Sequence, residues 1–166
     1  MDVLVVRHAP ALDKDEAKRK GIPDRDRPLT PEGRKSMKRV ARGLVSRVPT
    51  LSLLVTSPWR RAVETAELLS SRYGRLQRLE SDALVPGADP GALADQLAVH
   101  ATPPVVALVG HEPHLSSWVS WCLTGSMDAI VELRKGGACL LRFEEQIGEG
   151  RAKLAWLMTP AVLRRL

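Results

Sequence analysis

The run Val3-Leu4-Val5-Val6-Arg7-His8-Ala9-Pro10 places an arginine and a histidine at the point where an apolar strand stops. Two later segments follow apolar runs in the same way, namely Ser57-Pro58-Trp59-Arg60-Arg61-Ala62 and Gly110-His111-Glu112-Pro113. In open α/β sheets, ligands bind outside the carboxyl ends of the strands. The three strand ends are therefore expected to converge on one anion-binding site, although they lie far apart in sequence.

Strand and helix patterns alternate along the rest of the chain. The charged segment 13–27, with Gly21 and Pro23, predicts a mobile loop at the mouth of the site. Thr30 and Pro31 are suited to the N-cap and the first position of a helix. Strands are expected over 3–6, 51–56, 105–109, 138–143 and 153–158, with an extended piece at 76–79, and helices after Thr30, after Pro58, over 92–100 and after Pro113.

This alternation predicts an α/β fold whose mainly parallel sheet is covered by helices on both faces. The last two strands, joined near Gly148 and Gly150, can add an antiparallel edge. With 166 residues, 44% of them apolar, the chain is long enough for one core and short for two, so we expect a single domain over 1–166.

No targeting signal is evident. The chain passes from Met1-Asp2 directly into the first apolar run, without a basic start or a cleavage site, and every apolar run is shorter than the roughly 20 residues that span a bilayer. A cytoplasmic protein without a membrane partner is expected. Cys122 and Cys139 stand in separate expected elements without metal-binding spacing, so both are expected to be reduced core residues.

The charge balance favours anionic partners. Lys and Arg number 25 against 19 Asp and Glu, which gives a formal net charge of +6. Nucleic acid is not the expected partner, because no zinc-finger pattern is present and only 4% of the residues are aromatic.

The residues at the three strand ends suit phosphoryl transfer. A neutral imidazole can accept a phosphoryl group, which divides one difficult hydrolysis into two easier transfers, and His8 is the candidate nucleophile. The guanidinium groups of Arg7 and Arg61 can stabilise the phosphoryl oxygens, with His111 as a further donor or proton shuttle, so that no metal or other cofactor is required. Each motif alone could be a solvated turn or helix start, but their joint occurrence after three strands favours a site.

These segments resemble the histidine phosphatase (phosphoglycerate mutase-like) superfamily, in Arg7 to Ala11, Ser57 to Ala66 and Gly110 to Pro113. The small size, the segment 27–33 (RPLTPEG) and the ending 157–160 (LMTP) are similar to its SixA-type phosphohistidine phosphatase branch. The resemblance implies a three-layer α/β/α sandwich and a phosphohistidine intermediate on His8. It also implies a phosphate pocket that contains Arg7, Arg61 and His111.

Two features depart from the family pattern. The family usually has glycine where this chain has Ala9, so a glycine-only backbone angle there must be absent or strained. The glutamate that larger relatives use as general acid has no clear counterpart, and the candidates in that segment are Glu80, Asp82 and Asp89.

The missing acid bears on the substrate. Expelling an alkoxide requires a proton donor, because the pKa of its conjugate acid is near that of water, about 15.7. In phosphohistidine, by contrast, the leaving group is an imidazole. When its other nitrogen is protonated, this imidazole leaves phosphorus as a neutral molecule. A histidine-phosphorylated protein is therefore the expected substrate. The alternatives are a small phosphomonoester, which Asp82 or Asp89 would favour, and a non-catalytic module that binds phosphate or polyphosphate.

Three further side chains near the motifs are open to two interpretations. Arg27 and Arg60 either extend the positive field toward a larger anion or are simply solvated. His111 and His114 have a helical spacing that a metal could use, but no third ligand follows a clear pattern, so no metal site is expected.

Overall fold

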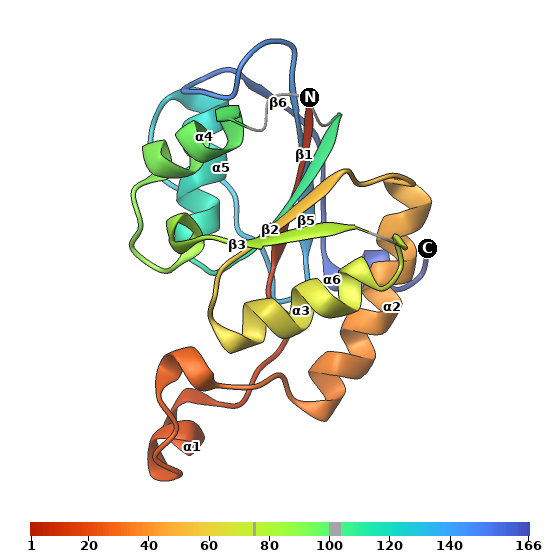
Figure 1. Ribbon diagram of the computed structural model, residues 1–166, viewed down its shortest axis with the longest axis vertical. Helices are drawn as coiled ribbons and strands as arrows, with labels where there is room; N and C mark the ends of the chain where they lie inside the picture. The colour runs from red at the N-terminus through yellow and green to blue at the C-terminus, as the bar shows by residue number, and fades with distance from the viewer. Residues whose placement is uncertain (75, 100–103) are drawn as a thin grey trace.

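The computed structural model describes residues 1–74, 76–99 and 104–166, and its centre is a six-stranded sheet (Figure 1). The strand order is β3-β2-β4-β1-β5-β6, in which the first four strands are parallel and β5 pairs antiparallel with both β1 and β6. The strands are β1 (Asp2–Arg7), β2 (Leu53–Thr56), β3 (Gln77–Glu80), β4 (Val105–Gly110), β5 (Ala138–Phe143) and β6 (Ala152–Met158). The mainly parallel sheet with an antiparallel edge is thus confirmed.

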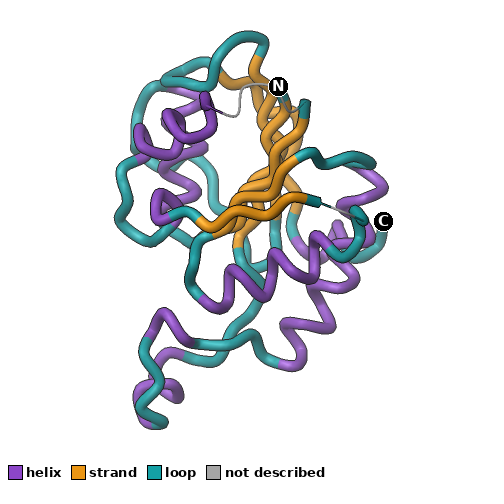
Figure 2. The backbone as a smooth tube through the Cα atoms, viewed as in Figure 1, coloured by secondary structure: helices purple, strands orange, loops and turns teal. Residues whose placement is uncertain are grey.

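Helices cover both faces of the sheet (Figure 2). They are α1 (Lys14–Arg19), α2 (Pro31–Arg47), α3 (Arg60–Ser70), α4 (Pro90–Val99), α5 (His114–Thr124) and α6 (Pro160–Leu163), with 3₁₀ turns η1 (Asp24–Asp26) and η2 (Asp82–Leu84). Alternate residues of β1 point to opposite layers: Leu4 and Val6 pack with α2, α3 and α6, whereas Val3 and Val5 pack with α4 and α5. The three-layer α/β/α sandwich is therefore confirmed.

The segment 13–27 lines the pocket, as predicted, but it contains helical turns where a loop was predicted. The carboxylate of Asp13 accepts hydrogen bonds from the backbone N–H groups of Asp15 and Glu16, which caps α1, and Ala17 on this helix is buried. Figure 1 shows that α1 projects beyond the body of the molecule, near the end of the sheet where β1 stops. A charged sequence was therefore the wrong basis for predicting a loop here, because a single capping carboxylate is enough to start a helical turn.

The other element boundaries shift by a few residues. The strand expected over 51–56 begins at Leu53, and the helix expected over 92–100 begins earlier, at Pro90. The expected end of that helix at His100 lies outside the described residues. The Thr30 cap is confirmed, since its hydroxyl oxygen accepts from the backbone N–H of Gly33 at 2.9 Å.

None of the helices in the described part of the chain combines the length and the apolar character of a transmembrane span. Cys122 and Cys139 are both free and buried, as expected.

Close packing of α6 on α2 depends on Gly43. A Cβ atom at this position would lie 1.9 Å from the carbonyl oxygen of Leu163. We predict that Gly43→Ala destabilises the protein by about 1–3 kcal/mol, because overpacking outweighs the better helix propensity of alanine. The measurement is the free energy of unfolding in urea. Gly91→Ala on α4 is the matched control, since its Cβ would meet only ordinary contacts at 3.4 Å or more and should not destabilise. Equal stabilisation by both substitutions would contradict the prediction.

Candidate active site

The ends of three neighbouring parallel strands bring the sequence motifs together. Arg7 at the end of β1 pairs with Gly110 at the end of β4, and the His8 N–H donates to the Gly110 carbonyl at 3.0 Å. On the other side of β4, the Ser57 N–H donates to the Val109 carbonyl at 2.9 Å. These backbone hydrogen bonds fix His8, Ser57 and His111 at the same edge of the sheet.

A pocket of about 380 Å³ lies at this edge. All four residues predicted from the motifs line it, together with residues that come from the α1–η1 segment and from the turn before β5. The lining residues are Arg7, His8, Ala11, Asp13, Lys14, Asp24, Arg27, Trp59, Arg61, Pro86, His111, Glu112 and Lys135.

The imidazole of His8 is held as one neutral tautomer. Its Nδ1 lies 2.7 Å from the Ala9 carbonyl oxygen. Because a carbonyl can only accept, Nδ1 carries the proton and Nε2 keeps its lone pair. The Nε of Arg61 donates to this Nε2 at 3.2 Å. Burial and the nearby arginine charges lower the pKa of His8 to about 3, so the ring is neutral at pH 7.

The imidazole of His111 lies beside His8, with the ring centroids 5.1 Å apart. Its Nε2 lies 2.8 Å from the hydroxyl oxygen of Ser57, which itself accepts from the Trp59 N–H at 3.3 Å. When the Ser57 hydroxyl donates to Nε2, the proton of His111 lies on Nδ1. Among the described residues, Nδ1 has no hydrogen-bond partner. Burial, with the neighbouring positive groups, lowers the pKa of His111 to about 2.

Two arginines border the histidines. Arg61, which is 4% exposed, donates from Nη1 to the Asp24 carbonyl at 2.6 Å, and its guanidinium lies 4.7 Å from the Trp59 ring centroid. Burial lowers the pKa of Arg61 to about 10, so it stays charged at neutral pH. Arg7 donates from Nη1 to the Leu133 carbonyl at 2.8 Å, while its buried Nε has no partner in the described part of the chain.

Thr65 connects the end of β1 to the helix that carries Arg61. Its hydroxyl oxygen accepts from the Ala9 N–H at 3.0 Å and donates to the Arg61 carbonyl at 2.7 Å. Ala9 is fully buried, and no non-glycine residue in the described ranges has a positive φ. The glycine-only backbone angle considered at Ala9 is therefore absent, and alanine fits the position without strain.

Arg27 and Arg60 have different surroundings. Arg27 lines the pocket, but its Nε donates to the Asp24 carboxylate at 2.6 Å and its Nη1 to the Leu12 carbonyl at 2.6 Å. Arg60 does not line the pocket; its Nε donates to Glu64 at 2.9 Å. Adjacent helical residues point in directions about 100° apart, so only Arg61 of the pair faces His8.

The three acid candidates lie outside the pocket lining. Glu80 is exposed at the end of β3. Asp82 is exposed on η2, and the exposed Asp89 accepts from the Gly91 N–H at 3.0 Å. Pro86, between them, is the residue of this segment that reaches the pocket.

Three carboxylates that do line the pocket, Asp13, Asp24 and Glu112, were not singled out from the sequence. Asp13 caps α1, and Glu112 accepts from the Ser116 hydroxyl at 2.7 Å. Burial raises the pKa of Asp24, but its hydrogen bond from Arg27 and the charge of Arg61 outweigh this effect and hold the pKa below its usual value. Backbone hydrogen bonds, above all from the Glu16 N–H, likewise lower the pKa of Asp13.

Lys135 was also missed. It lies in the turn before β5, where the Gly136 N–H donates to both the Arg7 and His8 carbonyls at 3.1 Å. Only this tertiary contact brings Lys135 to the pocket, so local sequence carries no signal for it. The motif residue Glu112, by contrast, directly follows His111 and could have been named.

The described residues contain no cluster of three or more His, Cys, Asp or Glu side chains arranged to hold a metal ion. His114 does not join His111 as a ligand pair, because its Nε2 donates to the Ala83 carbonyl at 3.0 Å.

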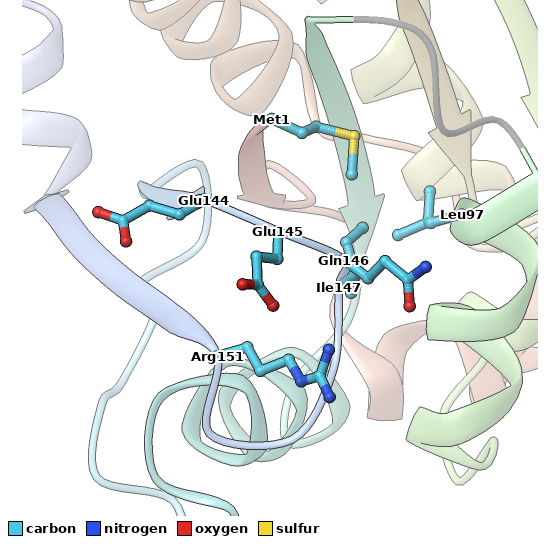
Figure 3. A pocket seen from close by; sticks show the side chains of 7 residues that line it. All are labelled: Met1, Leu97, Glu144, Glu145, Gln146, Ile147 and Arg151. Carbon is cyan, nitrogen blue, oxygen red and sulfur yellow. The ribbon is translucent and has the colours of Figure 1, made fainter.

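A larger cavity of about 690 Å³ lies beside the β5–β6 loop (Figure 3). It is lined by Met1, Leu97, Glu144, Glu145, Gln146, Ile147 and Arg151. Met1 precedes β1 whereas His8 follows it, so this cavity lies at the opposite end of the strand from the histidines. The convergent cations and imidazoles single out the smaller pocket as the candidate active site.

The fold and the pocket together define an α/β/α protein whose pocket places two arginines beside two neutral imidazoles. The sequence profile of the histidine phosphatase superfamily (branch 1) matches residues 3–85. A protein from Picosynechococcus sp. is 31% identical over 144 residues, which cover 86% of this chain and 85% of that protein. The chain belongs to the histidine phosphatase superfamily, and this membership makes it a phosphatase by class.

Solved structures agree with this fold. The protein histidine phosphatase SixA, complexed with tungstate, is 22% identical with a TM-score of 0.83, over 98% of this chain and 99% of that one. The alpha-ribazole phosphatase from Shigella flexneri is 15% identical with a TM-score of 0.76, over 96% and 97% of the two chains.

The buried neutral histidines predict acid sensitivity. The pKa of His8, about 3 in the folded protein, is below the value of about 6.5 expected after unfolding, so the unfolded state binds more protons between these two values. Stability should therefore fall as the pH is lowered from 7 toward 4. We predict that His8→Asn reduces the loss of unfolding free energy between pH 7 and pH 5 by about 1–2 kcal/mol. Urea unfolding at both pH values is the measurement, and identical pH dependence in wild type and variant would contradict the prediction.

Proposed function

We propose that this protein hydrolyses phosphohistidine on a protein substrate through a phosphohistidine intermediate on His8. The observation that carries the proposal is the lone pair on Nε2 of a neutral, buried imidazole, held beside the guanidinium of Arg61. Nε2 would attack phosphorus while the bond to the leaving group breaks, and water would then attack the phosphorus, releasing phosphate and restoring His8. Throughout, Nδ1–H remains hydrogen-bonded to the Ala9 carbonyl.

The surrounding groups would stabilise the transferred phosphoryl group. Arg61 can redirect its Nε–H from His8 to a phosphoryl oxygen, and the unpaired Nε of Arg7 supplies a second donor. The unpaired Nδ1–H of His111 would donate to a third oxygen. Arg27, although engaged with Asp24, adds positive charge at the pocket wall.

The carboxylates support a substrate with an easily expelled leaving group. Asp13 and Asp24, whose pKa values are lowered, are ionised at neutral pH, and Glu112 is already an acceptor for three hydrogen bonds. An ionised carboxylate cannot protonate a departing alkoxide, whereas the imidazole of phosphohistidine leaves without such help. The fold shared with SixA, which is named as a protein histidine phosphatase, points the same way.

A small phosphomonoester is the second candidate substrate, because the fold is also shared with the alpha-ribazole phosphatase. A non-catalytic phosphate-binding module is a third possibility, but binding alone requires the arginines rather than a neutral imidazole with a free lone pair.

The first test offers two substrates in parallel, a histidine-phosphorylated carrier protein and a small aryl phosphate. We expect rapid release of phosphate from the carrier, and a loss of at least about 10³-fold in His8→Ala, because the nucleophile is removed. Alkaline quenching during turnover should trap a phosphoenzyme in the wild type only. Activity confined to the ester would support the second candidate. Phosphate binding without turnover of either substrate would support the binding module.

The dependence of rate on the leaving group tests the absence of a general acid. We predict that kcat/KM falls steeply along a series of aryl phosphates of rising phenol pKa, and that alkyl phosphates react at least about 10²-fold more slowly. Asp82→Asn and Asp89→Asn should leave the whole series unchanged, since neither residue lines the pocket. A wild type that hydrolyses aryl and alkyl esters at equal rates, together with a variant that loses this activity, would instead identify the substituted residue as a general acid.

A further inference from the structure

One exposed face of α2 carries a stripe of positive charge that the candidate site does not use. Lys35, Lys38, Arg39 and Arg42 are all exposed. At 3.6 residues per turn, they fall within an arc of about 100° and span about 10 Å along the helix. The apolar side of α2, with Met37, Val40, Ala41 and Leu44, is buried on the sheet, so the stripe faces away from the core.

No acidic partner neutralises this stripe within the described residues. The neighbouring Arg34 is different, because its Nη2 pairs with Glu64 at 2.7 Å. Glu32, in the first turn of α2, is the acidic residue on this helix, and it forms no ion pair with the described part of the chain.

Helix α6 adds two cations beside the stripe. Figure 1 shows α6 beside α2, and α6 packs on α2 at Gly43. Directly after α6, the Nη1 of Arg164 donates to the Ser36 hydroxyl at 2.9 Å, and the next residue, Arg165, is exposed. The stripe and these two arginines form a group of six cations, which we call the α2 basic surface.

The helix that carries the α2 basic surface starts against the segment that follows His8. The N–H of Thr30 donates to the Pro10 carbonyl at 3.1 Å, and a Cβ on Gly33 would lie 2.0 Å from the same oxygen. Pro10 is two residues beyond His8, so the start of α2 is locked against the segment that carries the imidazole. A small phosphate ester inside a pocket of about 380 Å³ cannot extend along α2, whereas a protein domain of about 30 Å diameter can cover both.

Resting on the proposed function, we propose that the α2 basic surface docks an acidic surface of the histidine-phosphorylated protein substrate. Charge complementarity is the argument, because unpaired cations steer oppositely charged proteins into encounter. The stripe contains no aromatic residue on which a nucleobase could stack. The exposed apolar side chains beside it are Val162 and Leu166, near the C-terminal end, whereas the stripe itself presents only cations. An acidic protein is the partner that these features favour.

The test reverses charge on the stripe and compares two substrates. In Lys38→Glu/Arg39→Glu, we expect kcat/KM for a histidine-phosphorylated carrier protein of net negative charge to fall about tenfold or more at low ionic strength. The difference should shrink to within about twofold in 0.5 M salt, where the charges are screened. Hydrolysis of a small aryl phosphate should stay unchanged, which also shows that the variant is folded.

The matched control is Arg78→Glu/Arg151→Glu, which changes the net charge equally at two exposed positions, on β3 and in the β5–β6 loop. This control should lower turnover of the carrier protein by less than about twofold, because salt screens charges that lie far from the docked substrate. Suppose that the wild type hydrolyses the carrier protein and that both double variants lower kcat/KM for it equally. This result would overturn the docking surface while leaving the proposed function intact.

Two further outcomes would also overturn the inference. A wild-type enzyme that hydrolyses the aryl phosphate but not the carrier would overturn the proposed function together with the docking surface. Binding of anionic vesicles or single-stranded DNA that is lost in Lys38→Glu/Arg39→Glu, with carrier turnover unchanged, would assign the α2 basic surface to a membrane or to nucleic acid instead.

Discussion

The parallel pairing of β4 with β1 and β2 is the constraint on which the candidate site depends. The four apolar residues of β1 fill both helical layers and are flanked by Asp2 and Arg7, so a one-residue slip against β4 would draw a charged side chain into the buried part of the strand. The same register sets His8, Ser57 and His111 at one sheet edge. It also buries both imidazoles, and this burial keeps them neutral. Core packing and the protonation state of the site therefore have one structural cause.

The convergence of Arg7, His8, Arg61 and His111 could be predicted from sequence, because each lies at a strand end or in the segment that follows one, and the ends of parallel strands share an edge. The contributions of Asp24 and Lys135 could not. Asp24, in the α1–η1 segment, is held at the pocket by the hydrogen bond from Arg61 to its backbone carbonyl. Lys135 is held there by backbone hydrogen bonds from the neighbouring Gly136 to Arg7 and His8. Such placement depends on tertiary contacts rather than on any local pattern.

Glu64 shows why arginines with similar sequence surroundings differ in role. Its buried carboxylate accepts from the Leu29 N–H at 2.8 Å and pairs with both Arg34 and Arg60. A buried carboxylate left without partners would be costly, so these two arginines stabilise the junction of α2 and α3 rather than an anion in the pocket. Several basic residues lie close together in the sequence. Because Glu64 pairs with Arg34 and Arg60, these two are not available to a ligand.

The pocket concentrates positive charge while its carboxylates act as acceptors for hydrogen bonds. Such a site can stabilise a phosphoryl group through Arg7 and Arg61, but it provides little proton donation to a leaving group. Chemistry of this kind discriminates by leaving-group lability and hardly at all by the shape of the rest of the substrate. Selection among labile phosphoproteins must then come from contacts outside the pocket. The uncompensated cations of α2 are candidates to supply them, because the start of this helix packs against Pro10, two residues beyond His8.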